Sequence, residues 1–400
     1  MTRQRQLLTF GHSYVVALNR RLPHEMARIG RGRWNVVAAA PSFVHGDLRP
    51  IALESFPGEA CQLEHLKAYL TKRPHVMMYG SGLRNLLAKE WDLIHCWEEP
   101  FTFPAAQAAY WARKKKIVYY SYQNINKRYP PPFNWIERFA MDRSTGWVAG
   151  AEMVRETLLK RPIYPNRRHR VITLGVDTSI FRPDVDAKSA TLAELEWAPD
   201  GPPVVGYLGR FSDEKGLPML LRVLDAIRSD FRALFVGGGP LESVLRSIAE
   251  RSPKKIRVIT GVPHGEVPRY LNTMDILVAP SQTTLKWREQ LGRMLIEGFA
   301  CGIPVIGSNS GEIPHVIGDV GAIVGENDEA GWKTVLEELI ESPARRQDLG
   351  KRGRNRAEEE FAWPIIAQRH LDFFDELIDS FQLQITTPVK LPSPAVHTEL

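Results

Sequence analysis

Short apolar runs alternate with amphipathic helical patterns along almost the whole chain, and this alternation limits the possible folds more than any other feature. Continuous apolar strands separated by helices are typical of parallel sheets that are covered on both faces. The pattern therefore predicts an α/β fold with two doubly wound domains in series. The expected strands are 6–10, 34–38, 92–95, 116–121, 146–149 and 170–174 in the first half, and 204–209, 233–236, 256–259, 276–279, 304–306 and 322–324 in the second.

A polar, proline-bearing stretch, LGVDTSIFRPDVDAKS at 174–189, separates the two halves. We expect one domain at 1–180 and a second at 181–362, which is a usual size for domains of a 400-residue chain. A further helix is expected at 363–384. The tail at 385–400 contains three prolines and no periodicity, so we expect it to be disordered.

Charge and cysteine usage limit the possible partners and the compartment. The net charge of +6 favours anionic partners, but no basic and aromatic module typical of nucleic-acid binding is present, so no nucleic-acid partner is expected. The three cysteines, Cys61, Cys96 and Cys301, are far apart and show no disulfide or metal spacing, which fits a reducing cytoplasm. No apolar run approaches the roughly 20 residues of a transmembrane helix. The run at 7–10 is also too short for the core of a signal peptide.

Two basic side chains follow the first strand of the second half. Arg210 and Lys215 come directly after the strand that ends at Gly209. Because ligands of such sheets bind beyond the carboxyl ends of the strands, these cations form a candidate phosphate clamp. A solvated basic loop is equally compatible with them.

A glycine turn, FVGGGP at 235–240, follows the next strand and superficially resembles a dinucleotide fingerprint. Its third glycine is missing, because Glu242 stands there, and the expected acidic residue about 20 positions later is absent too. A plain tight turn explains the segment as well.

Glu289 and Glu297 are eight residues apart, with Gly292 between them near an expected helix start. Eight helical residues rise about 12 Å, which is close to the separation of sugar and ribose in a nucleotide sugar. A diphosphate between these two ends would meet the N–H groups of the helix N-terminus. An amphipathic helix with incidental glutamates fits the same spacing.

The second half contains, in order, the segments GR…EKG, GGGP, TMDILVAPS, E-x7-E and ACGIPVIGSNSGEIP. Together these segments resemble the retaining glycosyltransferases of family 4, of the bacterial group 1 type. The resemblance covers most of 204–324, and TLGVDTSIFRP is similar to the inter-domain segment of that family. It implies the GT-B fold, in which two Rossmann-like domains enclose the active site and a C-terminal helix crosses back to the first domain. The second domain would bind the donor and the first the acceptor.

The resemblance also implies roles for individual residues. Arg210 and Lys215 match the cations that bind the donor diphosphate, and Glu289 matches the carboxylate near the donor hexose. These three are the expected catalytic residues. Glu297 matches the carboxylate that holds the ribose. The other expected donor-binding residues are Gly209, Gly261, Val262, Pro263, Gly292, Arg293 and Met294.

The acceptor side departs from the family pattern. Many members carry a histidine after the strand at 116–121, but this chain has Tyr122, Gln123 and Asn124, none of which is a base near neutral pH. His12 is the alternative, at the end of the first strand, although a structural role fits it equally well. The acceptor-side candidates are Gly11, His12, His95, Glu98, Gln123 and Asn124. A buried structural role for His95 stays open, and we expect one of Glu98 and Glu99 to be solvated.

Two charged motifs are read as surface features. Asp184-Val185-Asp186 spells a metal motif of another glycosyltransferase fold, but no apolar strand precedes it, so we expect a loop. Lys114-Lys115-Lys116 is expected to be solvated, with contact to anionic lipid as the alternative.

The expected function is retaining transfer of a hexose from a nucleotide-diphosphate sugar to a saccharide or lipid-linked acceptor, without a metal or other cofactor. Bacterial surface polysaccharide or glycolipid synthesis, in the cytoplasm or peripherally at the inner face of the membrane, is the expected setting. The sugar, base, acceptor, linkage and oligomeric state stay open. Two alternatives are a nucleotide-sugar epimerase of the same architecture and a non-catalytic nucleotide-sugar-binding subunit, which the missing histidine motivates.

Overall fold

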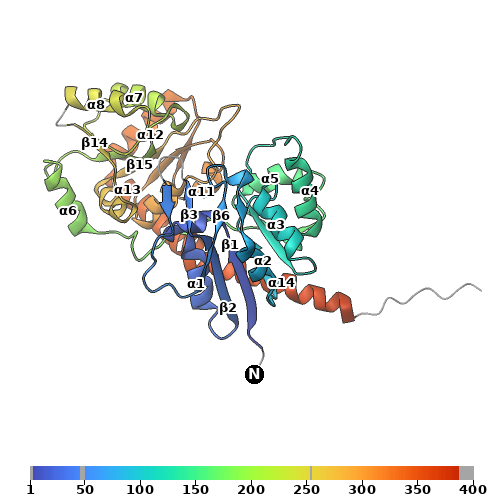
Figure 1. The fold of residues 1–400 in the computed structure, drawn as a ribbon. Coiled ribbons are helices and arrows are strands. Elements are labelled where there is room, and N and C mark those ends of the chain that lie inside the picture. The colour runs from blue at the N-terminus through green and yellow to red at the C-terminus, as the bar shows by residue number, and fades with distance from the viewer. Residues whose placement is uncertain (1–2, 46–49, 253–254, 387–400) are drawn as a thin grey trace, which may run out of the picture.

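The computed structural model describes residues 3–45, 50–252 and 255–386 of the chain. It contains two α/β units that lie side by side, an N-terminal unit at 3–171 and a C-terminal unit at 185–361 (Figure 1). The first is built on a seven-stranded sheet and the second on a six-stranded sheet. The prediction of two doubly wound units in series is therefore confirmed.

The N-terminal sheet has the strand order β11-β10-β9-β8-β1-β2-β5, and all neighbouring strands are parallel. Its strands are β1 (Arg5–Phe10), β2 (Trp34–Pro41), β5 (Gln62–Leu66), β8 (Leu93–Cys96), β9 (Ile117–Ser121), β10 (Gly146–Ala149) and β11 (Arg168–Val171). Six of them lie within a few residues of the predicted positions. The edge strand β5 was missed, because its mixed sequence QLEHL buries only Leu66 fully.

Two short antiparallel pairs of the N-terminal unit were also missed. They join β3 (Phe43–His45) to β4 (Pro50–Ala52), and β6 (Ala68–Tyr69) to β7 (Met78–Tyr79). These strands are only two or three residues long, so they carry no periodicity that the sequence would reveal.

The C-terminal sheet has the order β14-β13-β12-β15-β16-β17 and is parallel throughout. All six predicted strands are present, as β12 (Val204–Arg210), β13 (Arg232–Gly238), β14 (Ile256–Thr260), β15 (Ile276–Ala279), β16 (Val305–Ser308) and β17 (Ala322–Val324). Gly239, in the turn after β13, is required by packing, because a Cβ on it would lie 2.6 Å from the carbonyl oxygen of Phe211.

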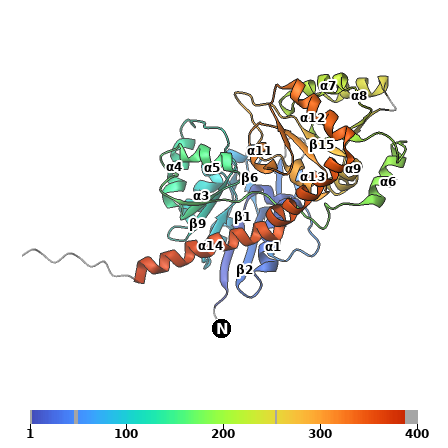
Figure 2. The same cartoon turned by 180° about the vertical axis from the view of Figure 1, so that it is seen from behind.

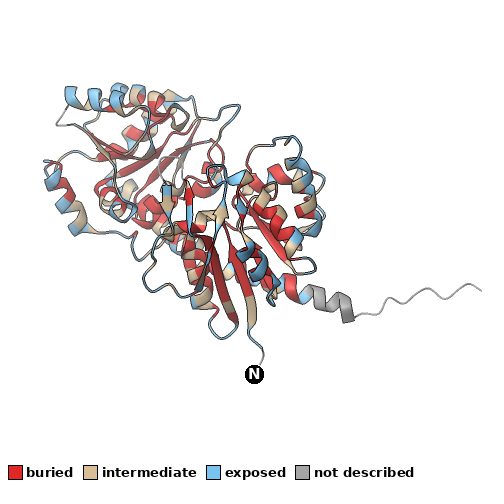
Figure 3. Ribbon diagram, in the orientation of Figure 1, coloured by how far each residue is buried: buried red, intermediate tan, exposed pale blue. Residues whose placement is uncertain are grey.

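Helices cover both faces of each sheet, and the buried strands run through the middle of each unit (Figure 3). In the N-terminal unit the helices are α1 (Arg21–Ile29), α2 (Ser81–Ala88), α3 (Phe103–Trp111), α4 (Phe133–Arg143) and α5 (Glu152–Leu159). The C-terminal unit has α6 (Val185–Glu194), α7 (Leu217–Ala226), α8 (Glu242–Arg251), α9 (Val267–Thr273), α10 (Arg293–Ala300), α11 (Ile313–Ile317), α12 (Glu329–Glu341) and α13 (Pro343–Arg356).

The first strand shows why continuous apolar runs are needed. Successive side chains of a strand point to opposite faces of the sheet. Accordingly Leu8 packs with Leu83 of α2 on one face, while its neighbour Leu7 packs with Leu22 of α1 on the other. Full burial of each leucine contributes roughly 1.5–3 kcal/mol. A polar residue at either position would therefore disrupt a core.

The long helix α14 (Trp363–Thr386) follows the C-terminal unit and crosses behind the N-terminal unit (Figure 2). It packs along α1, and Ile366 and Phe374 join the apolar cluster that contains Trp34. The helix expected at 363–384 is thus present. It includes the first two residues of the segment predicted to be disordered, and the remainder, 387–400, lies outside the described residues.

The connection between the units is shorter than predicted. Helix α6 begins at Val185, and the Asp184 side chain caps it by accepting a hydrogen bond of 2.9 Å from the N–H of Ala187. Asp184-Val185-Asp186 is therefore a helix start and not a loop, because aspartate is a favoured N-cap. Within the connection, Val176 pairs with Ala362, which places it beside the start of α14.

Candidate active site

The two cations after β12 occupy different environments. Arg210 ends β12, and its exposed guanidinium has no hydrogen-bond or ion-pair partner in the described parts of the chain. Lys215 ends a short 3-10 turn, Asp213–Lys215, and its Nζ lies 2.6 Å from Oε2 of Glu289. The same ammonium lies 4.9 Å from the centre of the Trp287 ring. An ammonium group has three donors, so Lys215 can contact an anion while it keeps the carboxylate.

Glu289 lies in an irregular segment, and the helical separation estimated for the two glutamates is wrong. Helix α10 begins only at Arg293, so the backbone between Glu289 and Glu297 bends instead of rising steadily. The Glu289 carboxylate also accepts a hydrogen bond of 2.9 Å from Oγ of Ser281. A Cβ on Gly311 would overlap the Glu289 backbone, so this segment depends on a glycine far along the chain.

Gly292 is the residue immediately before α10, as predicted. It has φ +71°, a left-handed conformation that favours glycine. The first turn of α10 stands beside the end of β12, since a Cβ on Gly209 would lie 3.8 Å from Sδ of Met294. Its N-terminal N–H groups add partial positive charge to that of Arg210.

Glu297 is buried in α10 and lies beside the loop after β14. Its Oε1 is 3.1 Å from Nε2 of His264 and 3.1 Å from Nε of Arg293. His264 directly follows the predicted base-binding segment 261–263, whose Gly261 has φ +70°. Oε2 of Glu297 has no partner among the residues that the structure describes, so it is available to a ligand hydroxyl.

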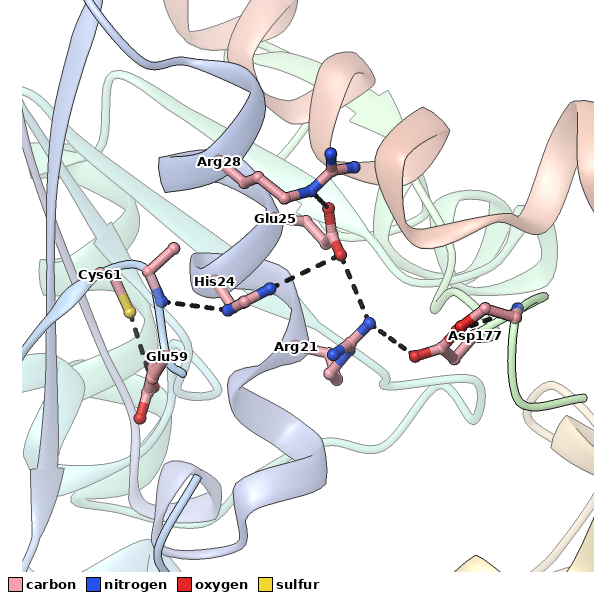
Figure 4. Close-up of polar contacts among 9 residues, drawn as sticks. Arg21, His24, Glu25, Arg28, Glu59, Cys61 and Asp177 are labelled. Carbon is pink, nitrogen blue, oxygen red and sulfur yellow. Dashed lines mark hydrogen bonds and ion pairs between the residues drawn. The ribbon is translucent and has the colours of Figure 1, made fainter. Parts of the chain in front are cut away.

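A pocket of about 330 Å³ lies between the two units at this point. Glu297, Arg293 and His264 line it from the C-terminal unit, and Leu18, Arg21 and Phe56 line it from the N-terminal unit. Arg21 also reaches Asp177 of the inter-unit connection at 2.6 Å and Glu25 at 3.4 Å (Figure 4). Sequence reasoning missed this contribution of α1, because Arg21 and Asp177 are far apart in the chain.

Gly11, His12 and Glu98 meet at the carboxyl ends of the adjacent strands β1 and β8. The Nδ1 atom of His12 is 2.6 Å from Oε2 of Glu98, and the backbone N–H of His12 donates to Oε1 over 2.7 Å. The His12 side chain is 33% exposed while that of Glu98 is fully buried, so only the imidazole can meet a ligand. Gly11 is needed for packing, because its Cβ would lie 2.7 Å from the carbonyl oxygen of Trp97.

Glu98 should control the protonation of His12. The carboxylate is the main cause that raises the His12 pKa above 6.5, because it stabilises the imidazolium against the opposing effect of burial. We expect Glu98→Gln to lower the His12 pKa, measured by NMR titration of the imidazole. Glu99→Gln is the matched control and should lower it much less, since Glu99 is the weakest of the causes. Equal pKa values in the wild type and Glu98→Gln would contradict this pairing.

His95 does not belong to the site, which corrects the sequence interpretation. It is completely buried, bonds to Oγ1 of Thr9 at 3.1 Å, and packs against His370 and Phe374 of α14. Burial lowers its pKa well below 6.5. Strand alternation explains the error, because His95 points to the face of β8 that α14 covers.

Gln123 is also withdrawn from the site. It is buried, its Nε2 donates to Oε2 of Glu99 at 2.9 Å, and its Oε1 accepts from the Arg161 guanidinium at 2.7 Å. Of the two glutamates of which one was expected to be solvated, Glu98 is fully buried and Glu99 is only partly exposed. Glu99 accepts a hydrogen bond of 2.6 Å from Oγ of Ser121, and burial raises its pKa.

Asn124 joins the two units instead of pointing to an acceptor. Its Nδ2 donates to the carbonyl oxygen of Arg288 at 3.0 Å. Beside it, both carboxylate oxygens of Glu312 accept backbone N–H bonds from Glu152 and Met153, at 2.8 and 2.9 Å. These bonds cap the first turn of α5 from the other unit. They hold the segment that carries Glu289 against the N-terminal unit.

The described residues contain neither a candidate metal site nor a helix that could span a membrane. Across the described residues, no three His, Cys, Asp or Glu side chains gather in a way that could hold a metal ion. Over the same part of the chain, no helix is both long enough and apolar enough to cross a membrane.

Comparison with known families accounts for the two units. The family described as Glycosyltransferase Family 4 matches residues 58–180, and the family described as Glycosyl transferases group 1 matches residues 194–356. The two matches follow each other without overlap and together take in most of both units. The chain belongs to the family 4, group 1 glycosyltransferases. The resemblance carried by the sequence motifs is thereby confirmed.

Characterised members of this family are similar to parts of the chain. An alpha-maltose-1-phosphate synthase of Mycolicibacterium smegmatis is 27% identical over 260 residues, which are 60% of this chain and 65% of that protein. A GDP-mannose-dependent alpha-(1-6)-phosphatidylinositol monomannoside mannosyltransferase of the same species is 34% identical over 198 residues, 47% of this chain and 51% of that protein. The chain thus spans less than two thirds of the length of each relative.

Solved glycosyltransferase structures share the fold over nearly the whole chain. A glycosyltransferase of Rickettsia africae has a TM-score of 0.74 at 17% identity and covers 94% of this chain and 99% of its own. A sucrose-phosphate synthase of Thermosynechococcus elongatus has a TM-score of 0.69 at 18% identity, with 94% and 100% covered. The Anabaena protein HepE, solved with UDP and glucose, has a TM-score of 0.67 at 16% identity, with 93% and 100% covered. The predicted GT-B fold is confirmed.

Proposed function

We propose that this glycosyltransferase moves a hexose from a nucleotide-diphosphate sugar to an acceptor hydroxyl, with retention at the anomeric carbon. The observation that carries the proposal is the convergence of positive charge at the end of β12. The Arg210 guanidinium and the Lys215 ammonium both come from the end of β12 and the turn after it. The start of α10 lies beside the same strand end. Such a preorganised cluster stabilises the negative charge that develops on a leaving diphosphate.

The remaining donor contacts follow from Glu289 and Glu297. Glu297, whose Oε2 is free of described partners, would bind the ribose hydroxyls. Glu289 has two roles in this scheme, because it holds Lys215 in place and stands next to the expected hexose position. The segment 261–263 would contact the base.

In the proposed chemical step, the acceptor oxygen attacks the anomeric carbon from the face that the leaving group occupies. The bond between the anomeric carbon and the phosphate oxygen breaks, the bond to the acceptor oxygen forms, and a phosphate oxygen takes the acceptor proton. No protein base is then required. His12, oriented by Glu98, would hydrogen-bond the acceptor from the N-terminal unit.

The acceptor is proposed to be a saccharide or a lipid-linked saccharide. Support comes from relatives whose names state synthesis of alpha-maltose-1-phosphate or mannosyl transfer to a phosphatidylinositol monomannoside. We propose a role in bacterial surface polysaccharide or glycolipid synthesis, on the cytoplasmic side of the membrane. The base and the sugar are left to experiment, since relatives use GDP-mannose and the Anabaena structure holds UDP.

The donor assignment is tested by thermal shift against UDP, GDP, ADP and their common sugar conjugates, with EDTA present. We expect one nucleotide series to raise the melting temperature, because binding to the native state at a hundredfold excess over Kd adds about 2.7 kcal/mol. Glu297→Ala should abolish the shift, and Glu250→Ala, an exposed glutamate of α8, should retain it. A shift that appears only when Mg²⁺ replaces EDTA would contradict metal independence.

The same experiment separates the alternatives. No shift with any nucleotide at millimolar concentration would overturn the donor site. A shift together with release of an epimer in the absence of acceptor would favour the epimerase. A shift without transfer to any saccharide acceptor would favour a binding subunit.

A further inference from the structure

A second pocket, of about 380 Å³, lies in the N-terminal unit among the loops that precede β9, β10 and β11. Seven of its twelve lining residues are lysine or arginine, and one, Asp142, is acidic. The charged lining comes from three separate loops, around Lys114, Arg143 and Arg167. The tertiary structure therefore brings Arg143, Arg167 and Arg168 into one concavity with the run Lys114–Lys116, although these segments are far apart in the sequence.

Part of the positive charge of this pocket has no charged partner. Arg113, Lys114 and Arg143 form no ion pair within the described residues. The Arg167 guanidinium donates only to the backbone carbonyl oxygen of Asp142, at 2.8 Å. A carbonyl oxygen accepts a hydrogen bond but carries no net charge. Like charges gathered in a concave surface repel one another and concentrate the local field, which attracts anions.

The pocket is separate from the proposed donor and acceptor residues. Parallel strands all begin at one edge of a sheet and end at the opposite edge. Lys116 directly precedes β9 and Arg168 begins β11, whereas His12 and Asn124 follow the ends of β1 and β9. The cationic pocket is consequently at the far edge of the N-terminal sheet, and Leu377 of α14 contributes to its wall.

We propose that this cationic pocket binds a phosphate-bearing ligand, independently of the donor site. Arginine and lysine around a concave surface provide the several donors that phosphate oxygens accept. The phosphate belongs either to a soluble molecule or to a lipid headgroup. The lipid source is a real alternative, because an adjoining surface shares Arg113 and Lys114 and carries Tyr110, which is 64% exposed.

The test uses inorganic tripolyphosphate as the soluble probe, with calorimetric titration of the full chain. The parent protein carries Arg210→Ser and Lys215→Ser, so that phosphate binding at the donor site is removed. The pocket variant adds Arg113→Ser, Lys114→Ser and Arg143→Ser. A matched control instead adds Arg31→Ser, Lys160→Ser and Lys351→Ser, three exposed cations outside the pocket that give the same net charge. Equal melting temperatures of the variants show that all are folded.

We expect the pocket variant to bind tripolyphosphate on the order of 100-fold more weakly than the parent, from about fivefold for each of the three cations, and the control to bind within a few-fold of the parent. Co-sedimentation with phosphatidylcholine vesicles, with or without phosphatidylglycerol, identifies the source. If the parent and the control bind anionic vesicles and the pocket variant does not, the phosphate belongs to a lipid headgroup. If the parent binds tripolyphosphate but no vesicles, the phosphate belongs to a soluble molecule. Equal behaviour of the pocket and control variants, or no binding of either probe by the parent, overturns the proposal. None of these outcomes depends on the donor site.

Discussion

Replacement of Lys215 by alanine is expected to lower kcat/KM by about 10²–10³-fold, as removal of one preorganised electrostatic donor does in other enzymes. Lys215 is the ammonium that Glu289 holds at 2.6 Å beside the end of β12. The proposed reaction places developing negative charge on the diphosphate at that point. Most of the loss should therefore appear in kcat, because the interaction strengthens as the leaving group departs.

The matched control is Lys188→Ala. Lys188 pairs with Asp275 at 2.7 Å in the same unit, but near the start of α6 and away from the pocket between the units. Both variants lose one partly buried lysine–carboxylate pair, so a general effect on stability should appear in both. We expect nearly wild-type kcat/KM for Lys188→Ala. Equal losses in the two variants, measured with the donor that thermal shift identifies, would show that Lys215 acts only through stability.

The largest effect on stability is expected at Gly216, next to Lys215. Gly216 has φ +75° at the start of α7, and a Cβ placed on it would overlap the carbonyl oxygen of Pro280. Alanine there combines the cost of a left-handed conformation with a steric collision against backbone. We expect the free energy of unfolding to fall by roughly 3 kcal/mol, the sum of about 1–2 for the conformation and 1–3 for the collision.

Gly261 provides the comparison that separates these two costs. It has nearly the same conformation, φ +70°, but no atom would lie within 4 Å of an added Cβ. Gly261→Ala should therefore lose only about 1–2 kcal/mol. Urea unfolding followed by tryptophan fluorescence measures both variants. If the two lose the same stability, the collision with Pro280 is relieved at no cost and the argument fails.

The architecture could be read from the sequence because both sheets are buried on two faces. A strand such as β1 must then be apolar at Leu7 and at Leu8, and such a run is visible without any knowledge of its partners. The edge strand β5 is exposed on one side, so it does not need a continuous apolar run, and for that reason it was missed. Gly292 before α10 was also predictable, since a helix start is encoded locally.

The donor residues were found through their motifs, but their geometry was not. The spacing of Glu289 and Glu297 suggested one helix, whereas the structure has a bend whose close packing depends on Gly311. On the acceptor side, His12 and His95 both stand at strand ends in the sequence. Only the structure shows that His12 pairs with Glu98 and that His95 is buried against α14.

The sequence by itself determined the fold class, the family and the positions of most strands along the chain, because hydrophobic burial and local motifs act over a few neighbouring residues. Only the tertiary structure decided which polar groups share a site. The pairs Lys215–Glu289, His12–Glu98 and Arg21–Asp177, and the cationic pocket around Arg143, each join segments that are distant in the chain. Hydrogen bonds and ion pairs depend on the distance and direction between two side chains. For residues so far apart, only the packing of the elements that carry them sets that distance.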